Sequence, residues 1–379
     1  MGEINQALMG YFWLFILLVP LIWYAFVLLS LKRAPSIKPP EFSEKKLPFI
    51  SVIIPFRNES RWLPDLIQSL KDQNFPRESW ELIMIDDHSL DSGPAMVSQF
   101  LNAFEPANRL IRLQEGQGKK EALAKGVEHA RSEWILATDA DCIFGKDWLR
   151  SYARIIASHE VSMICGPVKF KNGSNSVLAL FQRFEQAILM HICKASIASE
   201  RAILANGANM AFKRTHFSKA DLKKEQTASG DDIFLLHHIK QTDPSQITFN
   251  DQAEALVSTP LKRSLVRFLD QRIRWASKGR FYQDRDSLRY GFAITLANVG
   301  LMIVLVAVLF GWIDSWILLI GVVFKFIIDS ILFSRAKAFS DLPSPYFNFL
   351  WIFLTYPFYV IGIALLSLLY KPRWKGRKI

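Results

Sequence analysis

The sequence predicts an α/β domain built on a largely parallel sheet, with membrane-spanning helices before and after it in the chain. Three observations carry this prediction. Short apolar runs alternate with helical patterns between residues 50 and 140. Acidic clusters directly follow several of these runs, where open parallel sheets place their ligand-binding residues. Long apolar stretches occupy residues 10–31, 291–310, 316–333 and 347–370.

Residues 10–31 form the first predicted membrane helix. The segment contains no charged residue and is long enough to cross the hydrocarbon core. No basic region precedes it, so we expect a retained anchor and not a cleaved signal peptide. Lys32 and Arg33 follow it directly, and the positive-inside rule then puts the downstream domain in the cytoplasm.

The soluble domain opens with a regular alternation of predicted strands and helices. The first strand, residues 50–55, is apolar almost throughout, as in a strand buried on both faces of a parallel sheet. The further predicted strands are 82–85, 110–113 and 134–138, and the predicted helices between them are 63–70, 95–104 and 119–130. This order predicts βαβ crossovers and one parallel sheet.

Polar side chains follow three of these strands at the point where each strand ends. They are Arg57-Asn58-Glu59, Asp86-Asp87 and the pair Asp139 and Asp141. Because carboxyl ends of parallel strands meet at one sheet edge, we expect the three clusters to converge. Asp139 and Asp141 can face one point in space, and hard carboxylate oxygens suit Mg²⁺ or Mn²⁺. The alternative for so short a motif is a pair of solvated loop acids.

The pattern becomes less regular beyond Asp141. We expect a helix over 148–157, a strand over 163–168, a long helix over 176–199 and a turn at 206–209 that enters an apolar run. Gly230-Asp231-Asp232 begins an amphipathic helix, where acids also suit the helix dipole. Capping is therefore the ordinary alternative role for this acid pair.

Residues 259–275 are predicted to form a basic amphipathic helix that lies on the bilayer surface. Three apolar segments follow, and three full crossings from the cytoplasm would leave the basic tail outside, against the positive-inside rule. We therefore expect that one segment does not cross or that the tail is an exception. Lys325 and Asp329 lie one helical turn apart in the middle segment, either as a mutual ion pair or on an acceptor or lipid path.

These features divide the chain into six parts. The parts are an N-terminal anchor (1–33), a linker (34–48), a soluble domain (49–258), an interfacial segment (259–289), C-terminal membrane helices (290–370) and a basic tail (371–379).

The positive charge of the chain is concentrated in two blocks that border apolar segments. The net charge is +11, while residues 262–289 hold nine basic and three acidic residues and 371–379 hold five basic residues. These blocks account for the whole excess, and their position favours anionic lipid head groups. We expect no nucleic-acid partner, because such a domain would spread its basic residues over a folded face with interleaved aromatics.

The three cysteines indicate reduced thiols. Cys142, Cys165 and Cys193 are odd in number and widely spaced, and no two of them form a Cys-x-x-Cys pair. This argues against a disulfide framework or a zinc site and favours a cytoplasmic compartment.

Seven motifs in order resemble those of the membrane-anchored family 2 glycosyltransferases, the inverting group with a GT-A fold. They are Val52-Ile53-Ile54-Pro55 with Asn58-Glu59, Asp86-Asp87-His88-Ser89-Leu90-Asp91, Gly118-Lys119 with Ala122 and Gly126, Asp139-Ala140-Asp141, Gly207-Ala208-Asn209, Gly230-Asp231-Asp232, and Gln271-Arg272-Ile273-Arg274-Trp275. The final motif is similar to that of cellulose, chitin, hyaluronan and poly-N-acetylglucosamine synthases and of ceramide glucosyltransferases. Ala124 and His88 depart from the pattern, which often has Asn and Gly there.

The resemblance implies a role for each donor-site residue. Pro55, Glu59 and Asp87 would line the nucleotide-base pocket, with Asp86 supporting that turn and Lys119 near uridine or its phosphates. Asp139 and Asp141 would hold Mg²⁺ or Mn²⁺ on the donor diphosphate, with Asp141 as the direct ligand.

The resemblance also implies roles on the acceptor side. Asp232 would be the general base for the acceptor hydroxyl, and Asp231, which replaces the usual Glu, could share or exchange that role. Gln271, Arg274 and Trp275 would cap the diphosphate and acceptor side. For Trp275, an interfacial membrane anchor is the ordinary alternative.

The expected function is that of an integral membrane glycosyltransferase with a cytoplasmic catalytic domain. It would transfer a sugar from a UDP-sugar to a lipid or lipid-linked glycan acceptor, alone, with a partner subunit or as a homo-oligomer. A processive polysaccharide synthase is the alternative within the class, and a catalytically inactive membrane scaffold is the alternative outside it.

Overall fold

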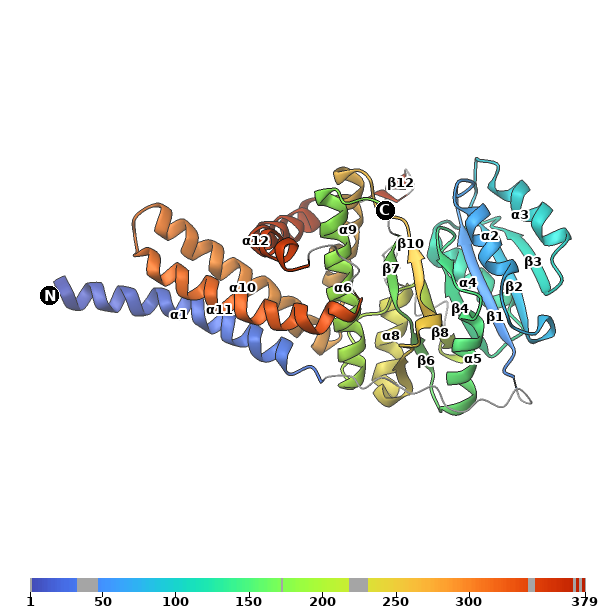
Figure 1. Ribbon diagram of the computed structural model, residues 1–379, viewed down its shortest axis with the longest axis horizontal. Coiled ribbons are helices and arrows are strands. Elements are labelled where there is room, and N and C mark those ends of the chain that lie inside the picture. The colour runs from blue at the N-terminus through green and yellow to red at the C-terminus, as the bar shows by residue number, and fades with distance from the viewer. Residues whose placement is uncertain are drawn as a thin grey trace.

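The protein is elongated, with membrane helices at one end and the α/β domain at the other (Figure 1). The computed structural model describes residues 2–32, 47–171, 173–217, 231–339, 345–370, 373–374 and 377–378. The polar linker and much of the basic tail thus lie outside the described residues. Two helices, α6 (Val177–Ala198) and α9 (Leu265–Ser277), stand between the domain and the membrane helices.

A seven-stranded mixed sheet forms the centre of the domain, in the order β3-β2-β1-β4-β8-β6-β9. The strands are β1 (Ile50–Phe56), β2 (Trp80–Asp86), β3 (Ala107–Arg112), β4 (Trp134–Thr138), β6 (Met163–Cys165), β8 (Asn209–Lys213) and β9 (Ile247–Phe249). The first four strands in this order are parallel, whereas β8 runs antiparallel to both of its neighbours. The predicted strands over 50–55 and 134–138 are confirmed.

Helices cover both faces of the sheet because alternate strand residues point to opposite sides. The covering helices are α2 (Leu63–Lys71), α3 (Gly93–Asn102), α4 (Lys119–His129), α5 (Trp148–Ser158) and α8 (Asp231–Thr242). Val52 and Ile54 of β1 belong to the core cluster that contains α2, α3 and α5, whereas Ile53 belongs to the one with α4 and α8. Gly126 lets α4 approach closely, since a Cβ there would lie 2.6 Å from Ile53 Cγ2.

The predicted strand over 163–168 is wrong, because two strands in different sheets share this segment. β6 ends at Cys165, and β7 (Val168–Phe170) joins a second sheet in the order β5-β10-β7, with β5 at Ile143–Phe144 and β10 at Val257–Thr259. Gly166 lies at the break, against Tyr152 and Asn209, with no room for a side chain. Pro167 follows and cannot donate a ladder hydrogen bond.

The helix predicted over 259–275 begins later than expected, at Leu265. Thr259 is the last residue of β10 and pairs with Phe170. Pro260 follows directly, and the residue before a proline is restricted to extended backbone. The strand therefore extends to this proline, and α9 starts after Ser264.

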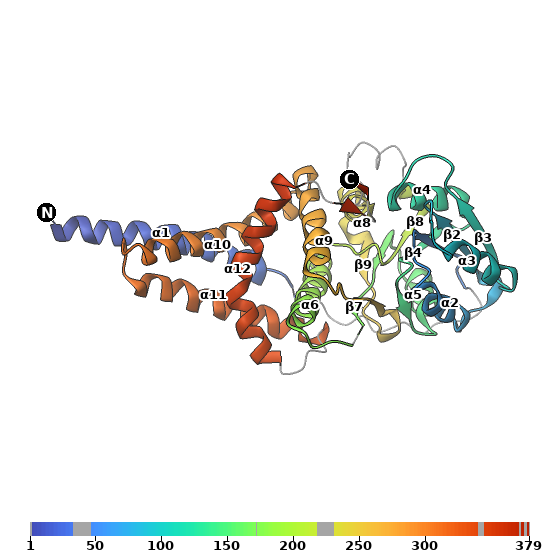
Figure 2. The same ribbon diagram turned by 90° about the horizontal axis from the view of Figure 1, so that it is seen from above.

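Among the described residues, four helices are long and apolar enough to cross a membrane. They are α1 (Gly2–Leu29), α10 (Arg285–Leu309), α11 (Ser315–Ala336) and α12 (Pro345–Leu369). Figures 1 and 2 show α1, α10 and α11 along the long axis of the molecule, whereas α12 lies across them near α9. The strands β11 (Arg373–Trp374) and β12 (Arg377–Lys378) lie beside the α/β domain in both views.

Lys325 and Asp329 form a mutual ion pair, as the simpler interpretation of the sequence predicted. Lys325 is fully buried in α11. The Tyr24 hydroxyl of α1 donates to Asp329 Oδ1 at 2.6 Å. Buried charges within apolar helices are paired in this way, and the pair ties α1 to α11.

Candidate active site

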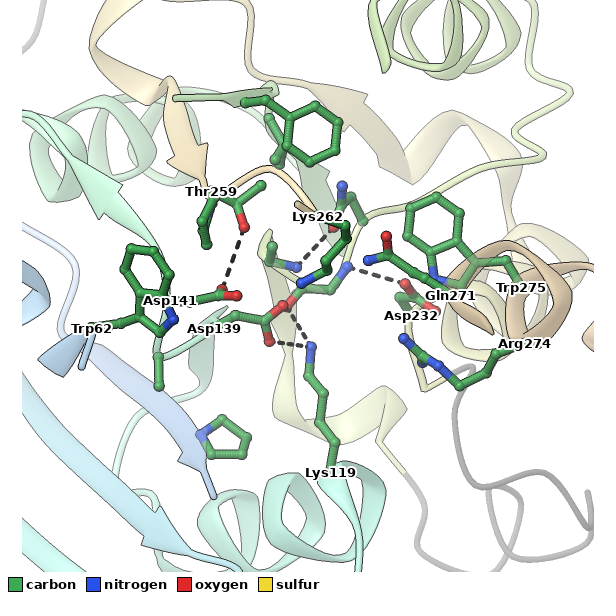
Figure 3. A pocket seen from close by; sticks show the side chains of 18 of the residues that line it. Trp62, Lys119, Asp139, Asp141, Asp232, Thr259, Lys262, Gln271, Arg274 and Trp275 are labelled. Carbon is green, nitrogen blue, oxygen red and sulfur yellow. Dashed lines mark hydrogen bonds and ion pairs between the residues drawn. The ribbon is translucent and has the colours of Figure 1, made fainter. Parts of the chain in front are cut away.

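A cavity of about 990 Å³ opens at the edge of the sheet where β1, β2 and β4 end (Figure 3). Its opposite wall is formed by the start of α8, the end of β10 and one face of α9. The cavity has the size of a typical ligand site. The acidic clusters that follow β1, β2 and β4 each contribute to its lining, through Glu59, Asp87 and the pair Asp139 and Asp141.

Asp87 holds together three loops at the sheet end of the cavity. Its side chain is 1% exposed, and its Oδ2 accepts a hydrogen bond from the Gly118 backbone N–H at 3.0 Å. Arg57 Nη1 donates to the Asp87 backbone carbonyl at 2.7 Å. Gly118 has φ of +99°, a conformation that favours glycine, and immediately precedes α4. Asp87 thereby fixes the position from which Lys119 enters the cavity.

The other residues expected near the nucleotide base are Pro55, Glu59 and Asp86, and not all of them line the cavity. Pro55 and Glu59 line it, whereas Asp86 is not among the lining residues. The Asp86 carboxylate instead accepts the Ser89 backbone N–H at 2.9 Å and lies 3.8 Å from Arg112 Nε. Asp86 therefore supports the turn after β2.

Asp139 and Asp141 follow β4 and point into the cavity (Figure 3). Lys119 Nζ lies 2.5 Å from Asp139 Oδ1 and 3.2 Å from the Gly207 carbonyl oxygen. Thr259 Oγ1 donates to Asp141 Oδ1 at 3.4 Å. No cluster of three or more His, Cys, Asp or Glu residues suited to a metal occurs in the described part of the chain. This donor set fits Mg²⁺ or Mn²⁺, which take few protein carboxylates and fill their remaining positions with water and phosphate oxygens.

Asp232, near the beginning of α8, is a half-buried carboxylate surrounded by hydrogen-bond donors and cations. Its Oδ2 accepts the Gly207 N–H at 3.1 Å, and its Oδ1 accepts the Ile233 N–H at 2.9 Å and lies 3.6 Å from Lys278 Nζ. Burial alone would raise the pKa of Asp232, but Lys278, Lys119 and the two N–H donors outweigh it and hold the pKa below its ordinary value. Asp232 is therefore ionised at neutral pH. The side chain of Asp231 lies outside the described residues.

Gln271, Arg274 and Trp275 lie on one face of α9 and line the wall opposite Asp141 (Figure 3). Residues three and four apart share a helix face, so this spacing brings all three to the cavity. Trp275 thus lines the cavity.

The cavity also contains residues that sequence reasoning missed. Lys278 is four residues after Arg274, so continuing the same helical stripe would have identified it. Thr259 ends β10, which gave no clear strand signal, and Lys262 lies in the loop between β10 and α9. Trp62 forms the rim after β1. Lys262, Arg263 and Arg267 make the rim next to α9 basic.

The chain is similar in sequence to known glycosyltransferases. Residues 51–219 match the family model described as Glycosyl transferase family 2. The glycosyltransferase AglE of Haloferax volcanii is 27% identical over 255 residues, which cover 66% of this chain and 80% of that protein.

Two other relatives match over shorter regions. The poly(ribitol-phosphate) β-N-acetylglucosaminyltransferase TarS of Staphylococcus aureus is 28% identical over 133 residues, which cover 35% of this chain and 23% of that protein. A dolichyl-phosphate β-glucosyltransferase of Dictyostelium discoideum is 29% identical over 160 residues, which cover 37% of this chain and 47% of that protein. The chain thus spans less than half the length of these two relatives.

The fold has a solved counterpart over nearly the whole chain. The mannosyltransferase PcManGT of Pyrobaculum calidifontis, in complex with GDP-Man and Mn²⁺, superposes with a TM-score of 0.59 and 18% identity. The superposition covers 97% of this chain and 99% of that one. The likeness therefore extends to the helices that flank the α/β domain.

Proposed function

Because residues 51–219 match the Glycosyl transferase family 2 model and four helices can cross a membrane, we propose that this chain is a membrane-anchored family 2 glycosyltransferase with a GT-A fold that transfers a sugar from a UDP-sugar to a membrane-associated acceptor. The composition of the cavity is the observation that supports this proposal. The cavity gathers Asp87, Asp139, Asp141 and Asp232 with the cations Lys119, Arg274 and Lys278. A nucleoside diphosphate donor needs an acidic metal site and cationic stabilisation, and an acceptor hydroxyl needs a base.

The proposed reaction is a single displacement. The acceptor oxygen attacks the anomeric carbon of the donor while Asp232 takes the hydroxyl proton. The bond from the anomeric carbon to the diphosphate oxygen breaks, and the nucleoside diphosphate leaves with the electron pair. Arg274 and Lys278 stabilise its negative charge. Because the attack comes from the face opposite the leaving group, the anomeric configuration inverts.

Asp139 and Asp141 are the residues that would hold Mg²⁺ or Mn²⁺, with Asp141 as the direct ligand. A bound divalent ion supplies additional neutralisation of the diphosphate. Lys119 lies 2.5 Å from Asp139 and occupies the same side of the cavity. It contributes a fixed positive charge next to the phosphates.

The rim next to α9 supports an acceptor that is held at the membrane surface. Leu265 and Val266 are 58% and 68% exposed, next to the basic residues Lys262, Arg263 and Arg267. Apolar and basic side chains together favour an anionic lipid surface. The similarity to a dolichyl-phosphate glucosyltransferase also supports a lipid or lipid-linked glycan acceptor. Lys32, at the domain end of α1, supports a cytoplasmic position for the domain.

A donor screen tests the proposal. The full chain in lipid nanodiscs would be incubated with UDP-, GDP- and dTDP-sugars, Mn²⁺ and a membrane lipid extract. Transfer from a UDP-sugar with a product one sugar heavier than the acceptor supports it. A ladder of products would instead support a polysaccharide synthase. If none of these donors is turned over and none binds, the result would favour a scaffold and overturn the proposal.

The pH dependence of transfer provides an independent prediction about Asp232. Lys278 is the largest influence that lowers the Asp232 pKa, so Lys278→Met should raise it. A base acts only when ionised, so activity is lost as the pH falls through this pKa. The acidic limb of the kcat/KM profile should therefore move to higher pH in Lys278→Met. An unchanged acidic limb would contradict Asp232 as the base, whatever the variant's maximal rate.

A further inference from the structure

Arg272 stands inside the Gln271-Arg272-Ile273-Arg274-Trp275 motif but is not among the residues that line the cavity. Its side chain is 3% exposed. Its guanidinium reaches Glu185 of α6, behind α9. Burying an arginine costs free energy unless its charge is paired and its N–H groups are hydrogen-bonded. The partners of Arg272 therefore indicate which groups it holds in place.

Two of these partners are cavity residues. Arg272 Nη1 donates to Gln271 Oε1 at 2.7 Å. The Arg272 guanidinium lies 4.3 Å from the centre of the Trp275 ring and 4.6 Å from that of Phe268. A planar guanidinium can stack on an aromatic ring and donate in its own plane, which lysine cannot do. Arg272 thereby fixes the orientation of both Gln271 and Trp275.

The other partners belong to the elements behind α9. Arg272 Nε donates to Glu185 Oε2 of α6 at 2.6 Å. The hydroxyl of Tyr359, in the membrane helix α12, donates to Glu185 Oε1 at 2.5 Å. Tyr359 also stacks on Phe268 of α9, with ring centres 5.9 Å apart. A continuous chain of contacts therefore leads from α12 to the wall of the cavity.

We propose that Arg272 is a positioning residue for sugar transfer and that α12, through Tyr359 and Glu185, is a structural part of the active site. The inference rests on the proposed function. Without the guanidinium, the Gln271 carboxamide and the Trp275 indole lose their fixed orientations, while the Asp139 and Asp141 side of the cavity is unchanged. A displacement of a positioning group by about 1 Å can lower a rate by about 100-fold.

The test is a double-mutant cycle in the full chain, reconstituted in nanodiscs and assayed for transfer with a saturating acceptor. Arg272→Gln should lower kcat/KM by at least about tenfold, and Tyr359→Phe, which removes only one hydroxyl, by a smaller factor. In the Gln271→Ala/Trp275→Ala double variant, adding Arg272→Gln should lower kcat/KM by less than a further twofold, because the groups that Arg272 positions are gone. Tyr359→Phe should likewise add nothing to Arg272→Gln.

Two outcomes would overturn the inference. One is wild-type kcat/KM in Arg272→Gln, and the other is a full additional loss on the Gln271→Ala/Trp275→Ala background, which indicates a role in folding alone. Tyr359→Phe keeps the aromatic packing and so gives a result even if Arg272→Gln is unstable. Thermal unfolding is measured for each variant.

A matched control and a binding assay separate this inference from the proposed function. Arg183→Gln removes another buried arginine, from α6, that is outside the cavity lining, and it should keep kcat/KM within twofold. UDP affinity in the presence of Mn²⁺ should change less than threefold in Arg272→Gln. Wild-type protein that transfers no sugar would fail the proposed function, whereas active wild type with an equally active Arg272→Gln would fail this inference alone.

Discussion

Asp232→Asn should lower the rate of sugar transfer by about 10³-fold or more while the chain still binds the nucleoside diphosphate. The amide cannot accept the acceptor's proton, but it keeps the size of the side chain. It also keeps an oxygen that can accept the Gly207 N–H, which now binds the carboxylate at 3.1 Å. The measurement is single-turnover transfer at saturating donor, together with UDP affinity by calorimetry.

The control for this variant is Asp243→Asn. Asp243 follows the end of the same helix, α8, lies outside the cavity lining, and accepts hydrogen bonds from Ser245. Its substitution should leave transfer within twofold of wild type. If Asp232→Asn kept more than a tenth of the wild-type rate, Asp232 would not be the base. If it lost nucleotide binding as well, the residue would be part of the donor site.

Asp141→Ala should remove the dependence of donor binding on Mn²⁺. Loss of an outer-shell partner of a metal ligand commonly weakens metal affinity by about 10- to 100-fold, and loss of a direct ligand should cost at least as much. UDP titrations at several Mn²⁺ concentrations measure this effect. We expect wild-type affinity to rise with Mn²⁺ and the affinity of Asp141→Ala to stay flat.

Asp147→Ala is the matched control for the metal site. Asp147 is the next acid along the chain, lies outside the cavity lining, and accepts a hydrogen bond from Asn74. Its substitution should keep the full Mn²⁺ response. A normal response in Asp141→Ala would exclude this residue as the ligand. Asp139 would then be the remaining candidate, although it is already paired with Lys119.

The sheet and its acidic edge could be predicted because long buried strands have a strong sequence signal. β1 and β4 are buried throughout, and each ends at polar residues that enter the cavity. β5, β7 and β10 have only two or three residues each. Such short segments have no periodicity to detect, so the second sheet was missed, together with Thr259 at its end and Lys262 in the loop that follows.

The residues behind the cavity were harder to predict than the residues that line it. Asp86 and Asp87 are neighbours in sequence, yet only Asp87, which follows the end of β2, lines the cavity, whereas the Asp86 carboxylate is turned to Ser89 and Arg112. Arg272 is in a motif that was recognised, but its partner Glu185 lies 87 positions away, and Tyr359, which also bonds Glu185, lies 174 positions from Glu185. Contacts at that separation arise from tertiary packing and have no local pattern.

The most direct test of the account is a structure of the full chain with UDP and Mn²⁺. We expect the uracil base against Pro55 and Asp87, the metal on Asp141, and the diphosphate directed toward Arg274. In that arrangement, Asp232 would face the position of the sugar's anomeric carbon. Nucleotide bound outside this cavity, or a metal bound without Asp139 and Asp141, would contradict the account.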